Sequence, residues 1–93
     1  MTPEQYEKHD DEYLKFDLVQ NKTSRRPDLH AFNLLDRLVP GEDDIVNAAE
    51  HDEIYLSVSP DELAKVATEE QIIELIRCGV RYDGNTGSLA LFV

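Results

Sequence analysis

Residues 53–93 contain strand, helix, helix and hairpin patterns in unbroken succession, and they constrain the fold more than any other part of the chain. At their start, Ile54, Leu56 and Val58 alternate with more polar residues. This period of two is typical of a strand that buries one face. The pattern therefore predicts a strand over residues 54–58.

Two helices are predicted after this strand, because two helix-capping patterns follow it. Residues 59–62 read Ser-Pro-Asp-Glu, with proline at the first helical position. Residues 68–71 read Thr-Glu-Glu-Gln, which favours a second, separate helix. Gly79 is expected to end that helix in the left-handed backbone conformation.

The C-terminal residues have the pattern of a β-hairpin. Val80 and Tyr82 alternate with charged residues, and residues 89–93 alternate again. Between them, residues 83–87 read Asp-Gly-Asn-Thr-Gly, which tolerate the positive φ angles of tight turns. The C-terminal part of the chain is thus expected to contribute three strands to one sheet.

The first 27 residues have weaker patterns. Residues 2–5 form a capping pattern that favours a helix reaching about Glu12, and residues 13–19 fit either a helix or an extended segment, of which we expect the extended one. Residues 20–27 lack large apolar side chains and end on proline, so they are expected to form a polar surface loop.

Two more helices are predicted in the middle of the chain. One covers residues 28–39 and is capped by Asp28, and a short one covers residues 45–49 and is capped by Asp43 or Asp44. The first would bury an apolar face made of Leu29, Phe32, Leu34, Leu35, Leu38 and Val39.

These elements predict a single α+β domain over residues 1–93, with short helices packed on a small, mainly antiparallel sheet. Residues 1–27 would form an N-terminal helix, an extended segment and the polar loop, and residues 28–93 a compact core. The order helix, strand, helix, helix, hairpin resembles that of a winged-helix domain. The resemblance is one of topology and carries no sequence motif, so it implies a fold and no function.

The charge of the chain is its strongest global feature. Its 93 residues include 20 acidic and 9 basic side chains, for a formal net charge of −11. Such a field repels phosphate backbones, so direct binding to nucleic acid is disfavoured and a protein partner with a basic surface is favoured. The helix in the recognition position, residues 68–78, carries Glu69, Glu70 and Glu74 against Arg77, which would also be repelled by DNA.

Two groups of charged residues are candidate binding sites. Lys22, Arg25 and Arg26 form the only local cationic cluster in the sequence and could hold an anion. The acidic side chains that are candidates for contact with a basic partner are Asp10, Asp11, Glu42, Asp43, Asp44, Glu50 and Asp52.

Residues suited to catalysis are few. His51 and its acidic neighbours could ligate a metal, but no spacing matches a known metal-binding motif, and no metal or other cofactor is predicted. Cys78 beside apolar residues is more typical of a buried hydrophobe than of a nucleophile. We therefore expect a protein without enzymatic activity.

Three functional hypotheses follow. The first is a small acidic regulator or inhibitor that binds a protein, of the kind that would suit a phage or an accessory bacterial gene. The second is a nucleic-acid mimic, whose carboxylates imitate phosphates, and the third is a metal-dependent enzyme using His51. The chain has no apolar stretch long enough for a membrane span or signal peptide, and its single cysteine fits a reducing cytoplasm. Residues 88–93 could form an edge strand that pairs with a second copy, so a homodimer remains open.

Overall fold

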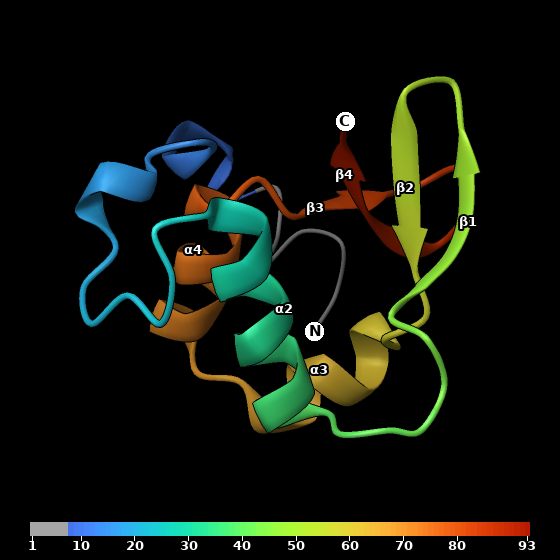
Figure 1. The fold of residues 1–93 in the computed structure, drawn as a ribbon, viewed down its shortest axis with the longest axis horizontal. Coiled ribbons are helices and arrows are strands. Elements are labelled where there is room, and N and C mark those ends of the chain that lie inside the picture. Colours follow the sequence, from blue (N-terminus) through green and yellow to red (C-terminus); the bar gives the residue numbers. More distant parts are fainter. Residues whose placement is uncertain (1–7) are drawn as a thin grey trace.

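The computed structural model describes residues 8–93 and has an α+β architecture (Figure 1). Within these residues, three α-helices lie to one side of a four-stranded antiparallel sheet. In chain order the elements are the 3-10 turns η1 (Asp10–Glu12) and η2 (Phe16–Leu18), helix α2 (Pro27–Leu38), strands β1 (Val46–Glu50) and β2 (Glu53–Leu56), helices α3 (Pro60–Val66) and α4 (Glu69–Arg77), and strands β3 (Arg81–Asp83) and β4 (Ser88–Phe92).

The strands lie in the order β1, β2, β4, β3, and every neighbouring pair is antiparallel. Strand β4 is central, because Leu91 pairs with Ile54 of β2 and Leu89 pairs with Tyr82 of β3. The C-terminal strand therefore lies between β2 and β3 and is not the edge strand that its position suggested. A homodimer stays a hypothesis.

Local sequence signals explain why α3 and α4 form two separate helices. The hydroxyl of Ser59 accepts a hydrogen bond from the backbone N–H of Glu62. At Thr68 the full capping box forms, with Gln71 bonding back to the Thr68 N–H at 2.8 Å. Gly79 ends α4 with φ of 101°, as its position predicted, because only glycine adopts this backbone readily.

The hydrophobic core lies between the three helices and the inner face of the sheet. Its largest fully buried side chains come from all of these elements, and they are Leu35, Leu63, Ile72, Leu75, Val80 and Leu89. Burial of this kind supplies most of the free energy of folding. The predicted core strand, helices and hairpin of residues 53–93 are thus all present.

The N-terminal segment differs in part from its predicted structure. The capping pattern at residues 2–5 lies outside the described residues. A single 3-10 turn, η1, stands where the predicted helix was to end, and the segment over residues 13–19, expected to be extended, contains the turn η2. Both turns pack on α4, so tertiary contacts override the weak local pattern here.

Strand β1 replaces the short helix predicted over residues 45–49. The prediction relied on Asp43 and Asp44 as caps and on the helix propensity of Ala48 and Ala49. Pairing with β2 decides the outcome instead, and two alanines carry too small a side chain to hold a helix on the core. The sheet therefore has one more strand than the sequence indicated.

Helix α2 also differs in detail from its prediction. It begins at Pro27 with Arg26 in the capping position, so Asp28 lies inside the first turn and does not cap the helix. The buried face of α2 is rotated relative to the predicted face, because Leu29 is exposed whereas His30 is only 3% exposed. A buried histidine on this face is unexpected, and it is bonded on both sides, as described below.

With β1 set aside, the order α2, β2, α3, α4, β3, β4 is the one that resembled a winged-helix domain. The additional strand at the edge is not part of the predicted pattern. The α+β class is thus confirmed, while winged-helix topology stays a prediction.

Candidate functional site

The β1–β2 hairpin is the part of the sheet that extends farthest from the helices (Figure 1). Its two-residue turn consists of His51 and Asp52, with φ of 52° and 64°. Positive φ at both positions is the mark of the type I′ turn, which matches the twist of the flanking strands. Glu50 and Glu53 close this turn as a pair.

The outer side of β1 has no neighbouring strand within residues 8–93. All five residues of the strand, Val46–Glu50, are exposed, and Ala48 and Ala49 have side chains too small to shield the backbone. A break in the register between Val46 and Ala48 gives the strand a bulge. Strand β1 is therefore an open sheet edge that is regular only over its second half.

Backbone N–H and C=O groups of successive strand residues point to opposite sides, which identifies the free groups of β1. The C=O of Asp52 accepts a hydrogen bond from the N–H of Val93 at 2.8 Å. The backbone groups of Asp52 therefore point toward β4, and so do those of Ile54 two residues later. Ile54 pairs with Ala49 across the hairpin. Because neighbouring pairs in an antiparallel ladder alternate, Ala49 directs its N–H and C=O away from β2 and into solvent.

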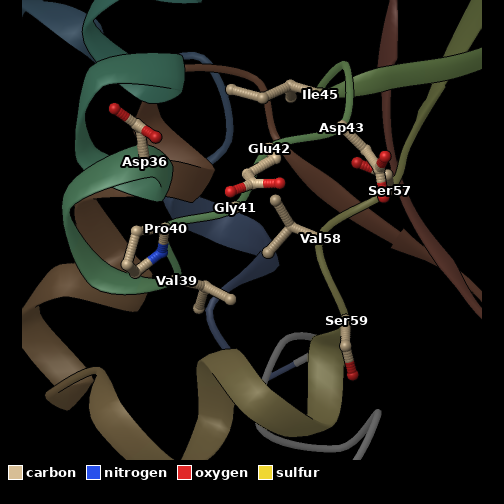
Figure 2. Close-up of a pocket in the computed structure, with 10 residues that line it drawn as sticks. All are labelled: Asp36, Val39, Pro40, Gly41, Glu42, Asp43, Ile45, Ser57, Val58 and Ser59. Atoms are coloured by element: carbon tan, nitrogen blue, oxygen red, sulfur yellow. The ribbon is translucent and has the colours of Figure 1, made fainter.

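A hollow of about 250 Å³ lies where the chain leaves α2 and enters β1 (Figure 2). Three carboxylates line it: Asp36 from α2, and Glu42 and Asp43 from the following loop. Its apolar wall comes from Val39, Pro40, Ile45 and Val58. The lining includes no lysine or arginine.

The loop beside this hollow is fixed to the sheet by Ser57. Its hydroxyl donates to the carbonyl oxygen of Asp44, and its N–H donates to that of Ile45, both at 2.7 Å. These bonds hold residues 42–45 against the end of β2. The acidic side chains of this loop are thus presented from a defined backbone.

Five of the seven predicted partner-binding acids are brought to the two ends of β1. Glu42, Asp43 and Asp44 precede the strand, Glu50 ends it and Asp52 lies in the turn after it. Four of them make no ion pair within the described chain. Glu50 contacts only His51, at 3.0 Å between two exposed side chains. We call β1 together with these five acids the acidic edge.

The other two predicted acids lie elsewhere. Asp10 and Asp11 belong to η1, which packs on α4. Figure 1 places this segment on the side of the molecule away from β1. The neighbouring Glu12 accepts a hydrogen bond from Arg77 Nε at 2.8 Å, and this bond lowers the pKa of its carboxyl.

The three residues of the predicted anion-binding cluster lie in the loop between η2 and α2. Lys22 lies over the ring of Phe16, with Nζ 5.0 Å from the ring centroid, which is a cation–π contact. Arg25 and Arg26 are exposed residues of the loop before α2. Across residues 8–93, no carboxylate forms an ion pair with any of the three.

Sequence reasoning missed His30. Its Nδ1 accepts a hydrogen bond from the N–H of Thr23 at 3.1 Å, and its Nε2 lies 2.9 Å from a carboxylate oxygen of Glu74. A backbone N–H can only donate, so Nδ1 is unprotonated and Nε2 carries the proton. Asn33 extends the network by donating to the Thr23 hydroxyl. Both ring nitrogens are thus engaged in hydrogen bonds. His30 connects the loop at Thr23 to helices α2 and α4, and neither nitrogen is free for a reaction.

Cys78 is buried, as its apolar neighbours predicted. Burial, and to a smaller extent the nearby Glu74 carboxylate, raise the pKa of its thiol to about 12. The thiol is therefore protonated at neutral pH. No reactive thiolate is available at this position.

The His51 metal hypothesis gains no support from geometry. His51 contacts only Glu50 and lies in an exposed turn. In the part of the chain that is described, no group of three or more histidine, cysteine or acidic side chains is arranged to hold a metal ion.

A second groove, of about 430 Å³, is mainly apolar. It lies between the N-terminus of α2, the segment at Tyr13 and Leu14, and the ends of β2 and β4. Phe92 and Val93 form its exposed rim. Nothing in the arrangement of residues 8–93 identifies what would cover this groove.

No protein-family model matches the chain, and comparisons with curated proteins and with solved structures found no match. No helix within residues 8–93 is long and apolar enough to cross a membrane. The site must therefore be interpreted from its own chemistry.

Proposed function

We propose that this protein is a small acidic regulator or inhibitor that binds a protein with a basic surface through the acidic edge. One observation supports the proposal more than any other. From residue 42 to residue 53 the chain carries six acidic side chains and no lysine or arginine. These residues surround an exposed strand rather than being scattered over the fold.

The electrostatic argument favours a basic partner. Elsewhere, carboxylates are partly neutralised by ion pairs such as Glu12 with Arg77 and Glu69 with Lys8. The five acids of the acidic edge lack such cations. A surface of one sign raises the rate of encounter with a surface of the other sign and disfavours partners of like charge.

Binding is favoured over catalysis, because the buried histidine and the single cysteine are both unavailable for chemistry. His30 has both nitrogens in hydrogen bonds, and Cys78 is a buried, protonated thiol. The proposal includes a cytoplasmic location, which the single free cysteine favours.

The proposal is tested by affinity capture from host lysate, with identification by mass spectrometry and with two matched variants. The edge variant carries E42Q, D43N, D44N, E50Q and D52N. The control variant carries D10N, D11N, D17N, D61N and E70Q, which change the net charge equally at unpaired acids elsewhere. A partner that binds the wild type and the control variant but not the edge variant is the expected result.

Equal capture by the two variants would contradict the proposal, because net charge alone would then explain binding. Repeating the capture with excess duplex DNA separates the mimic hypothesis from the broader one. Displacement by DNA would identify the partner surface as a nucleic-acid channel. A partner that DNA does not displace binds through a surface other than a nucleic-acid channel.

A further inference from the structure

We propose that the partner contributes a basic extended segment, which adds to the free side of β1 as a fifth strand and places a lysine or arginine side chain in the hollow beside Asp36. This inference rests on the proposed function and specifies how the acidic edge binds. It concerns the backbone of β1 as well as its charge.

The first step is the unpaired backbone. Ala49 directs its N–H and C=O into solvent, as the pairing of Ile54 with Ala49 and of Asp52 with Val93 requires. An extended peptide can satisfy both groups by strand addition, in which main-chain hydrogen bonds supply affinity and alternate side chains supply specificity. The small side chains of Ala48 and Ala49 leave the approach open.

The second step is the choice of occupant. A second copy would pair antiparallel through its own β1, which brings Glu42, Asp43 and Asp44 of one copy toward Glu50 and Asp52 of the other. Like charges placed opposite one another disfavour this arrangement. A basic segment has the complementary charge at both ends of the strand.

The third step is the hollow. Ile45, Ser57 and Val58 line it and also lie where β1 and β2 begin to pair, so the hollow adjoins the start of β1. The apolar wall suits the aliphatic stem of a lysine or arginine. Asp36 and Glu42 suit its cationic end. Figure 2 shows the Glu42 carboxylate between Asp36 and Val58.

The bulge limits how long the added strand can be. Regular pairing covers Ala48–Glu50 only, because the register shifts between Val46 and Ala48. A bulge and charged flanks are the features with which sheets avoid unselective edge pairing. The geometry therefore favours a short segment of defined charge over general aggregation.

A synthetic peptide provides the probe. A fluorescent octapeptide of alternating arginine and threonine is titrated with the protein, and so is the same peptide N-methylated at every residue. Both have the same charge, but the methylated peptide has no backbone N–H donor on either edge. We expect the unmethylated peptide to bind wild-type protein about tenfold more tightly, at the scale of one or two hydrogen bonds.

Two variants of β1 make the test specific. A49P removes the outward N–H without touching a bond to β2, since proline is tolerated on an edge strand in this orientation. A49G keeps the N–H and is its control. Amide spectra of both variants report whether the hairpin is intact. We expect A49P to lose about tenfold in affinity for the unmethylated peptide, and A49G to retain most of it.

The hollow is tested with D36N/E42Q against D61N/E70Q, which remove the same charge from α3 and α4. Only the first pair is expected to weaken binding, by about tenfold at low salt. Equal binding of the two peptides, or equal affinity of A49P and A49G, would overturn strand addition. Binding through charge alone would then remain, and the proposed function would stand. Loss of partner capture by both the edge and the control variants would instead remove the proposed function.

Discussion

His30 ties three separate segments together at the scale of one residue. It joins the backbone of Thr23, its own helix α2 and Glu74 of α4. Replacement by leucine leaves the Thr23 N–H and the Glu74 carboxylate without their partner in a partly buried site. We expect H30L to lower the free energy of unfolding by about 2–3 kcal/mol.

Urea denaturation measures this loss. The control is H51N, at an exposed position whose positive φ asparagine tolerates. Its change should stay within about 0.5 kcal/mol. An H30L variant as stable as the wild type would mean that the network of His30 contributes nothing to folding.

Cys78 provides a second prediction at this scale. With a pKa of about 12, roughly one thiol in ten thousand is ionised at pH 8. Modification by a disulfide reagent at pH 8 should therefore be slower in the native protein than in urea by several orders of magnitude. Comparable rates in both conditions would show that the thiol is open to solvent and ionised.

The residues that sequence patterns located correctly are those whose role is local. The hydroxyl of Thr68 and the amide of Gln71 meet across one helical turn, and Gly79 meets the demand of a helix end. The burial of His30 was not predictable in this way. Its partner Glu74 lies 44 positions along the chain, so only the packing of α2 on α4 brings the two together.

At the scale of elements, the β1–β2 hairpin shows the same limit. Val46–Glu50 contains two alanines and follows two aspartates, a pattern that favours a helix locally. The strand forms because β2 offers a partner and because the turn at His51 and Asp52 reverses the chain. Predicting it would have required recognising His-Asp as a type I′ turn, a role usually taken by Asn-Gly.

The candidate site was predictable in composition but not in arrangement. The acids of the acidic edge are plain in the sequence, whereas their separation from Asp10 and Asp11 depends on where η1 packs. The hollow was not predictable, because Asp36 and Glu42 belong to different elements.

The turn yields a prediction for the element. Glycine adopts positive φ without the steric cost that Asp52 bears at 64°. We expect D52G to raise the free energy of unfolding by about 0.5–1 kcal/mol and to slow amide exchange in β1. A helix over residues 45–49 would give the opposite result, since glycine beyond such a helix would only add disorder. Denaturation and hydrogen exchange distinguish the two.

At the scale of the whole molecule, the net charge of −11 opposes folding through self-repulsion. Salt screens this repulsion, so raising sodium chloride from 10 to 150 mM should stabilise the protein by about 1 kcal/mol, or about 4–8 °C in Tm. The edge variant carries five fewer negative charges, so salt should stabilise it less than it stabilises the wild type. Calorimetry measures both, and a Tm that falls with salt would contradict the prediction.

Strand β1 contributes no side chain to the buried core, since each of its five residues is exposed. Mutations there consequently escape the packing constraints that limit change at Leu35 or Leu89. Selection could redesign this strand for a new partner while the rest of the fold kept its stability. The molecule thus separates the part that must be conserved to fold from the part that is free to evolve in recognition.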